Sequence, residues 1–257
     1  QTAVHFLDNV IGMCEYPLKE NRKIVEKNRK IGLGIMGFAD MLIKLGIPYD
    51  SNEGLETAEK IMKFISKEAT EASMELARAR GVFPSWKDSI YNTKNKKIKL
   101  RNATLTTIAP TGTISIIADT SSGIEPLFAL SYARKTAEGN TLIYFNKDLK
   151  KSLKDNGEYN DEVIEKINNE GSIQNIQEIP EMSEMQHISE HAQKSKIFDG
   201  IKRIFKVGSD IGPEWHVEMQ AAFQKYVDNG ISKTVTLPKD ATVEDDEKIF
   251  TMAYELG

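Results

Sequence analysis

The residues best suited to bind a charged ligand form the break Pro110-Thr111-Gly112-Thr113 in an otherwise apolar stretch. Proline fixes a φ angle, glycine lets backbone N–H groups approach a ligand closely, and the two threonine hydroxyls can donate hydrogen bonds. If a helix follows from Ile114, its first N–H groups have no partner inside the helix and favour negative charge. We therefore expect the N–H groups of residues 111–115 to converge on a phosphate, without the lysine of a Walker motif. An ordinary strand–turn–helix connection is the alternative.

A strand and a helix must position this break. Leu105–Ile108 carries β-forming side chains and no charge, which predicts a strand that enters the loop. The apolar residues after Gly112 predict the helix that leaves it. Strands alternate with helices along the rest of the chain, and this order predicts a mainly parallel α/β arrangement.

The clearest local pattern is a long helix that begins near Asp50. Asp50 and Glu53 have the spacing of a capping box, apolar residues then recur at helical intervals as far as Leu76, and Gly81 is a typical helix stop. Further helices are expected over 19–30, 141–156 and 160–171, from Pro213, and from Thr242 with Asp245; further short strands are expected over 128–132, 201–207 and 233–237.

The composition of the 257 residues limits the classes of partner and compartment. A net charge of −4, with lysine and glutamate mixed along the chain, argues against a nucleic-acid polymer, which would require a basic stripe. No apolar run is long enough to cross a membrane, and no charged-then-apolar leader is present. One cysteine excludes an internal disulfide and a cysteine-based metal cluster, so a reducing cytoplasm is the expected location.

A glycine pattern offers a second nucleotide-binding hypothesis. Gly32, Gly34 and Gly37 satisfy G-x-G-x-x-G, and Asp50 follows at a plausible distance. The pattern indicates a dinucleotide site only after a buried strand, and the charged residues 25–30 do not form one. Close packing of another segment against this glycine-rich face is the preferred interpretation.

Several titratable residues have both a functional and a structural interpretation. His187 and His191 have the spacing of zinc ligands on a helix, but no third ligand is well placed, so two surface histidines are preferred. His216 is expected to be a structural donor rather than a base. Glu125 is left open between a helix cap and a contact to a ribose. The basic cluster Lys202, Arg203 and Lys206 is expected to be a solvated face.

Longer strings of sequence resemble one known family. The residues from Ala109 to Ala118, followed by Ser121-Ser-Gly-Ile-Glu-Pro126, closely resemble the catalytic subunit of ribonucleotide reductases, most of all the adenosylcobalamin-dependent class II enzymes. Further similar strings follow in family order, with the poorest match at about 136–200: Phe6-Leu-Asp-Asn-Val-Ile11, Asn28 to Asp40, His216 to Gln224, and Ile231 to Val235.

The resemblance implies a fold and a reaction. The fold would be a ten-stranded α/β barrel, of which residues 1–257 would form roughly the second half as one partial barrel domain, with a divergent segment at about 136–200. The parent enzyme reduces ribonucleotides to deoxyribonucleotides for DNA replication by a radical mechanism. Adenosylcobalamin would generate a thiyl radical in the full enzyme. On this analogy the residues that bind the substrate phosphates are Pro110, Thr111, Gly112, Thr113 and Ile114, with Ser115 close by.

The chemistry of the full enzyme is not carried over to this chain. The family's radical cysteine lies in an Asn-x-Cys-x-Glu motif, whereas Cys14 has Gly12 and Tyr16 at the matching positions, so we expect it to have a packing role. No catalytic residue or metal ligand is assigned, and the chain alone is expected to be inactive. Its expected partners are a ribonucleotide and the remainder of the reductase chain, and a homodimer of the full enzyme is left open. A non-catalytic nucleotide-binding remnant and a bare structural fragment are the alternatives.

Overall fold

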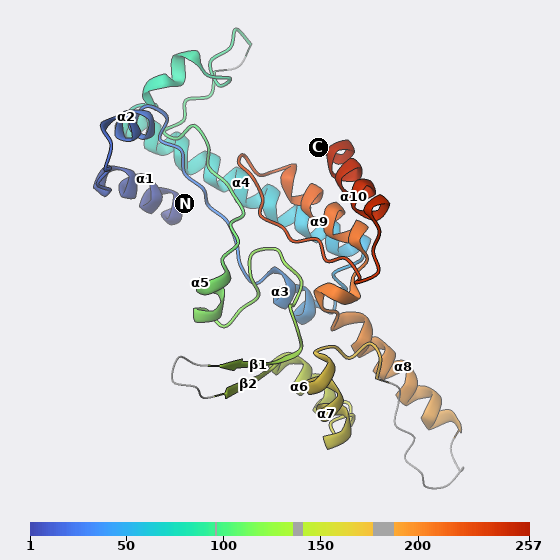
Figure 1. Cartoon of the computed structure of the whole chain (residues 1–257). Coiled ribbons are helices and arrows are strands. Elements are labelled where there is room, and N and C mark those ends of the chain that lie inside the picture. The colour runs from blue at the N-terminus through green and yellow to red at the C-terminus, as the bar shows by residue number, and fades with distance from the viewer. Residues whose placement is uncertain (96, 136–140, 177–187) are drawn as a thin grey trace.

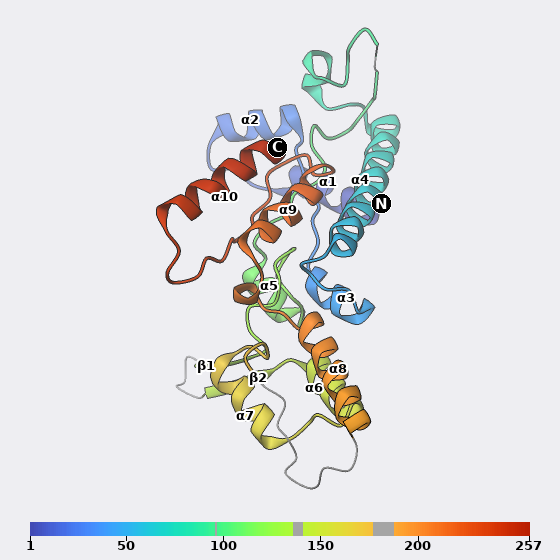
Figure 2. The same cartoon turned by 90° about the vertical axis from the view of Figure 1, so that its right-hand side faces the viewer.

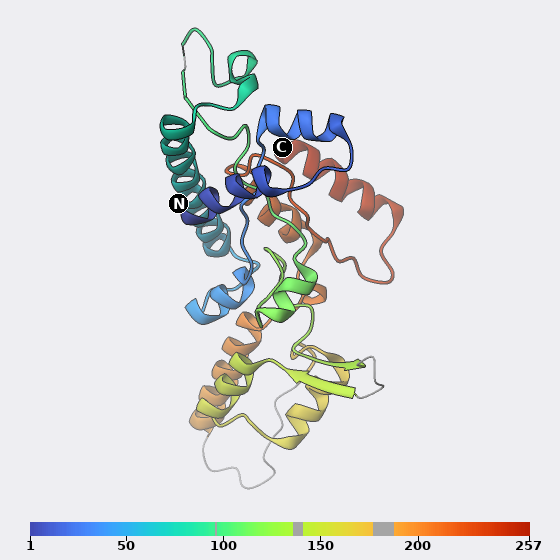
Figure 3. The same cartoon turned by 90° about the vertical axis from the view of Figure 1, so that its left-hand side faces the viewer.

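A computed structural model describes residues 1–95, 97–135, 141–176 and 188–257. The molecule is elongated, and its elements lie in three levels that keep the same order in all three views (Figures 1, 2 and 3). Helices built around one long helix form the upper level, two short helices lie in the middle, and a hairpin with three helices forms the lower level. The segment of the predicted phosphate-binding residues, 110–115, lies in the middle level, where it leads into α5 (Figure 1).

The upper level contains α1 (Thr2–Met13), α2 (Lys19–Asn28), α4 (Asn52–Arg80), the 3-10 helix η1 (Pro84–Asp88), α9 (Pro213–Gln224) and α10 (Val243–Leu256). The long helix α4 packs against α1 and α9. Helix α10 packs on α9, and α2 packs on η1.

The middle level holds α3 (Phe38–Leu45) and α5 (Gly112–Ile117), and the lower level begins with a two-stranded sheet. Strands β1 (Ser131–Lys135) and β2 (Thr141–Phe145) pair antiparallel, with Ser131 opposite Phe145. Around them lie α6 (Lys147–Asp155), α7 (Asp161–Glu170) and α8 (Ile188–Ile204), and the 3-10 helix η2 (Gly208–Asp210) follows. The described part of the predicted divergent segment thus belongs to the lower level.

Two apolar clusters hold these levels together. The larger cluster runs from Phe38 in α3, whose ring meets that of Phe223 edge-to-face at 5.0 Å, to buried leucines and isoleucines of α6, α7 and α8. The smaller cluster joins α1, α4 and Leu105. Apolar burial is the main stabilising contribution to such a fold. No helix among the described residues is both long and apolar enough to cross a membrane.

Several predicted helices are confirmed. The long helix runs over residues 52–80 and stops at Gly81, although its N-cap is Ser51, whose hydroxyl accepts from the Gly54 N–H at 3.1 Å, rather than Asp50. The helix from Thr242 has the full capping box with Asp245. The helices predicted near 19–30, near 160–171 and from Pro213 are also present.

The prediction of a mainly parallel strand arrangement is correct only in part. In the described residues the regular sheet is antiparallel, and parallel pairing occurs only as isolated bridges. Residues 105–108 are extended between two such neighbours, with Thr106 bridged to Leu33 and Ile108 bridged to Ile231. The described residues are therefore helix-rich, and they form no closed barrel.

Two predicted strands, and the start of the helix predicted over 141–156, are wrong. Residues 201–204 continue α8, because Phe198, Ile201 and Phe205 have helical spacing and are all buried. Residues 141–145 form β2, and Asn146 then caps α6 by accepting from the Leu149 N–H. Residues 233–237 form no strand.

The glycine-rich face packs closely, as predicted, and leaves no space for a dinucleotide. A Cβ on Gly32 would lie 2.4 Å from Thr107, one on Gly34 would lie 2.3 Å from the Thr107 carbonyl oxygen, and one on Gly37 would lie 2.4 Å from the Thr120 hydroxyl.

We therefore expect Gly34→Ala to lower the free energy of unfolding by about 2 kcal/mol, because a backbone carbonyl cannot move aside as a side chain can. Urea unfolding of the chain measures this loss. Gly12→Ala is the control, since nothing lies within 4 Å of a Cβ at Gly12, and it should not lower stability. Equal effects of the two substitutions would contradict the packing argument.

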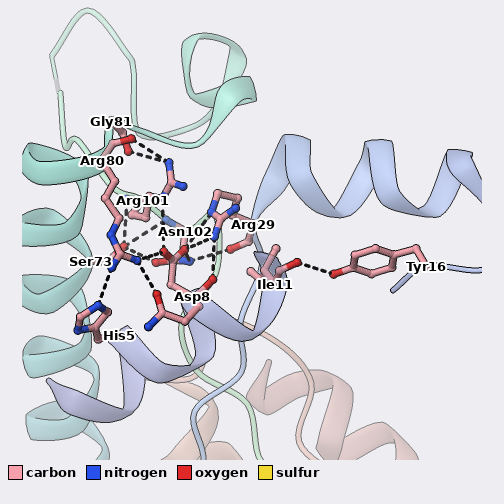
Figure 4. A network of polar contacts seen from close by, with 11 residues as sticks. His5, Asp8, Ile11, Tyr16, Arg29, Ser73, Arg80, Gly81, Arg101 and Asn102 are labelled. Carbon is pink, nitrogen blue, oxygen red and sulfur yellow. Dashed lines mark hydrogen bonds and ion pairs between the residues drawn. The ribbon is translucent and has the colours of Figure 1, made fainter. Parts of the chain in front are cut away.

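An ion network around the buried carboxylate of Asp8 joins α1, the end of α2, α4 and residues 101–102 (Figure 4). The Asp8 carboxylate accepts from Arg29 at 2.7 and 2.9 Å, from Arg80 at 3.1 Å and from the Asn102 amide at 3.0 Å. Arg101 also forms an ion pair with this carboxylate, with its Nε 3.5 Å from Asp8 Oδ2. Asp8 is 1% exposed, so a buried carboxylate neutralises part of the charge of Arg29, Arg80 and Arg101, whose own side chains are partly exposed.

Candidate functional site

In the predicted phosphate-binding segment, residues 110–115, the backbone turns at Thr111 rather than at Gly112. Thr111 has φ 55° and ψ 20°, the left-handed conformation that β-branched residues seldom adopt, and it immediately precedes α5. Gly112 is not among the residues with positive φ. No atom lies within 4 Å of a Cβ built on Gly112, so open space faces this residue. Strained backbone of this kind is concentrated at ligand sites.

Hydrogen bonds within the loop hold this turn. The Gly123 N–H donates to Thr111 Oγ1 at 2.8 Å, and the Ser115 N–H donates to the Thr111 carbonyl at 2.9 Å. Ser115 is buried, and its hydroxyl lies 3.0 Å from the Gly112 carbonyl and 2.8 Å from the Ser122 hydroxyl. The Ser115 N–H is thus already used, and Ser115 supports the loop from within.

The segment after α5 is fixed to α3 by a carboxylate that sequence inspection did not identify. Asp40 Oδ2 accepts from the Thr120 hydroxyl at 2.8 Å and from the Ser121 N–H at 2.6 Å, and the Gly37 N–H donates to the Ser121 carbonyl. The Tyr49 hydroxyl donates to the Ile124 carbonyl at 2.8 Å. The only sequence signal for Asp40 is its position as an acidic residue in the first turn of a helix. This signal does not indicate that Asp40 contacts Thr120 and Ser121.

The outer face of the loop is exposed and apolar. Pro110, Gly112 and Thr113 are exposed, and Ile114, Ile116 and Ile117 of α5 are 54–79% exposed. Three neighbouring isoleucines in water are unfavourable, and patches of this kind mark surfaces that another segment or a ligand covers.

Glu125, which is partly exposed, and His216, which is buried, belong to one polar cluster with Lys233. Glu125 accepts from the Lys233 ammonium at 2.6 Å and from the Thr234 N–H at 2.7 Å, so it caps no helix. His216 Nε2 lies 3.1 Å from the Gly208 carbonyl, as the expected structural role requires. Burial, and then the charge of Lys233, lower the pKa of His216 below its ordinary value.

The other candidate residues lie elsewhere or outside the described residues. Cys14 is exposed at the end of α1, so the predicted packing role is wrong. Lys206 pairs with Asp50 instead of lying free in solvent. His187, and the side chain of His191, lie outside the described residues. The residues that the structure describes contain no group of three or more metal-ligating side chains.

Comparison with known proteins identifies the family. The family model described as "Ribonucleotide reductase, barrel domain" matches residues 1–257. The vitamin B12-dependent ribonucleoside-diphosphate reductase of Thermoplasma acidophilum is 44% identical over 255 residues, which cover 99% of this chain and 30% of that protein. The protein of the same name from Mycobacterium tuberculosis strain CDC 1551 is 39% identical, over 98% of this chain and 33% of its own length.

A solved structure has the same fold. The class Id ribonucleotide reductase alpha subunit of Actinobacillus ureae superposes with a TM-score of 0.77 at 26% identity, over 99% of this chain and 43% of that subunit. The chain thus spans about a third of the length of the curated relatives described above. Because the family model matches the whole sequence, this chain belongs to the ribonucleotide reductase family and corresponds to part of its barrel domain.

Proposed function

We propose that this chain is the part of a ribonucleotide reductase that binds the phosphates of the substrate nucleotide. The observation that carries the proposal is the strained left-handed turn at Thr111, which precedes a helix start and faces open space at Gly112. The first N–H groups of α5 have no acceptor within the helix, so they can donate hydrogen bonds to phosphate oxygens. The Thr113 hydroxyl can donate to them as well. In this proposal Pro110, Gly112, Thr113 and Ile114 contact the phosphates, while Thr111 and Ser115 shape the loop.

The relatives are named ribonucleoside-diphosphate reductases, so a nucleoside diphosphate is the substrate class that we propose. In the intact reductase, a nucleoside diphosphate should slow hydrogen exchange of the amides of residues 112–114. Protection elsewhere with none in this loop would exclude the proposed site. A non-catalytic nucleotide-binding remnant is the second candidate, and it would show the same protection without turnover.

Adenosylcobalamin is the cofactor that the names of the vitamin B12-dependent relatives suggest for the full enzyme. When bound, it supplies the radical that starts the reaction. Neither of two hollows among the described residues fits this large group: one of about 10 Å³ is lined by Ala39 and Leu42, and one of about 400 Å³ is lined by charged side chains of α2. We therefore assign its binding to other parts of the reductase, and no step is derived through it.

The remainder of the reductase chain is the partner that we propose for the exposed face of α5. Its isoleucines would be buried against that part, which would also enclose the nucleotide. A cytoplasmic location and a homodimer of the full enzyme stay predictions.

We expect no deoxyribonucleotide to form when the purified chain alone is supplied with nucleoside diphosphate, adenosylcobalamin and a dithiol reductant. A radical reductase needs a thiyl site and a separate pair of thiols, whereas this chain has one cysteine, and Cys14 is exposed to water. An enclosed pocket is also needed to protect radical intermediates. Chromatographic detection of product is the measurement, and product that disappears in Cys14→Ala would overturn the expectation.

A further inference from the structure

The buried side chain of Lys233 contacts Glu125 and His216, the two other members of the polar cluster described above. The side chain of Lys233 is 0% exposed, whereas Lys side chains are almost never fully buried unless they are paired. Its ammonium donates to Glu125 Oε2 at 2.6 Å and to the Thr234 carbonyl at 2.6 Å, and it lies 2.8 Å from His216 Nδ1. All three donor positions of the ammonium are therefore used.

The histidine has one protonation state that satisfies every contact. A lysine ammonium only donates, so His216 Nδ1 accepts, and Nε2 carries the hydrogen that is donated to the Gly208 carbonyl. His216 is therefore neutral and orients the ammonium of Lys233 toward Glu125. Burial lowers the pKa of Lys233, and the hydrogen bond and charge of Glu125 oppose that effect.

Glu125 connects this cluster to the loop through a short path. Its Oε1 accepts from the Thr234 N–H at 2.7 Å, and its own N–H donates to the Ser122 carbonyl at 2.8 Å. Gly123 lies between these two residues and donates to Thr111 Oγ1. Gly123 has φ 46°, and a Cβ there would lie 3.1 Å from the Ala109 carbonyl oxygen, so this turn has little freedom to shift.

We propose that Lys233 is a positioning residue for the phosphate loop: by fixing Glu125 it holds the turn at Gly123, whose N–H keeps Thr111 in its left-handed conformation. Lys233 does not contact the substrate. The identity of the ligand rests on the proposed function, but the effect of Lys233 on the loop is present in the free enzyme as well. Removing the ammonium should therefore loosen the loop before any nucleotide binds.

The test compares Lys233→Met with Lys225→Met in the intact reductase. Methionine keeps most of the apolar stem of lysine and removes the charge. Lys225 provides the matched control, because it pairs with Glu59 at 2.5 Å but lies on the surface. In Lys233→Met we expect amides of residues 111–123 to exchange about tenfold faster, and the KM for nucleoside diphosphate to rise about tenfold with kcat within about twofold. Lys225→Met should leave all three quantities unchanged.

A second variant keeps the proposal testable if Lys233→Met does not fold. Glu125→Gln retains an acceptor but loses the charge, so it should change exchange and KM in the same direction by a smaller factor. The double variant should be no worse than Lys233→Met alone, because both residues act along one path.

Lower thermal stability with wild-type exchange at residues 111–123 and wild-type KM would overturn the proposal, since Lys233 would then be only a structural residue. Failure of the proposed function has a different signature. In that case nucleoside diphosphate would not protect residues 112–114 in the wild type, while faster exchange in free Lys233→Met would still support the positioning role.

Discussion

Replacement of Asp8 by alanine should lower the free energy of unfolding of the chain by about 3 kcal/mol, because it leaves Arg29 and Arg101, whose side chains are 11% and 17% exposed, without their counter-charge. Asp8 is 1% exposed and accepts from Arg29, Arg80 and Asn102, so a single substitution removes partners from α4 and from two connecting segments. Denaturant unfolding followed by far-UV circular dichroism measures the loss.

An exposed ion pair provides the control. Arg22 and Glu26 lie 2.9 Å apart on α2 and are both more than half exposed, so Glu26→Ala should cost less than about 0.5 kcal/mol. A loss below 1 kcal/mol in Asp8→Ala would mean that the arginines find water or other partners and that the network contributes little.

The same network predicts a dependence of stability on acid. Burial raises the pKa of Asp8, but hydrogen bonds and charges from Arg29, with Asn102 and Arg101, outweigh it and hold the pKa below its ordinary value of 3.8. The stabilisation is therefore fully present above the unfolded-state value and is lost as the pH falls through the folded-state value. Asp8→Asn should show a smaller loss of stability between neutral and acidic pH than the wild type, and equal slopes would contradict this assignment.

Replacement of Gly112 by valine should raise the KM of the intact reductase for nucleoside diphosphate about 100-fold, with little change in stability. The open space at Gly112 accommodates a side chain without a clash in the free protein, so the added methyl groups would occupy the position proposed for the phosphate. Thr113→Val removes one hydroxyl donor and should weaken binding by about 1–2 kcal/mol. Steady-state kinetics and calorimetric titration of the nucleotide measure both effects.

Gly200→Val is the matched control for this substitution. Gly200 is also a helical glycine with nothing within 4 Å of a Cβ, but it belongs to α8 and not to the loop. It should leave KM unchanged. Wild-type affinity in both Gly112→Val and Thr113→Val would contradict the phosphate cradle.

The local elements of this protein could be predicted from the sequence where short-range rules dominate. Helical periodicity and Gly81 predicted α4, and Thr242 with Asp245 predicted the start of α10, because these signals act between residues three or four positions apart. The strings around Pro110 and Gly123 also predict the correct family. Close packing against the face that contains Gly34 was also predicted, but its partner Thr107 was not.

Only the tertiary structure decided how these elements meet. The left-handed conformation falls on Thr111 rather than on Gly112 because Thr111 Oγ1 receives a hydrogen bond from Gly123, twelve residues later. Lys233 and Glu125 are separated by 108 positions, and no spacing rule connects them. Residues 105–108 have strand propensity, yet their pairing is limited to isolated bridges because a parallel ladder depends on distant neighbours on both sides. Local propensity specifies what a segment prefers, whereas burial and long-range hydrogen bonds determine its partner and therefore the shape of the site.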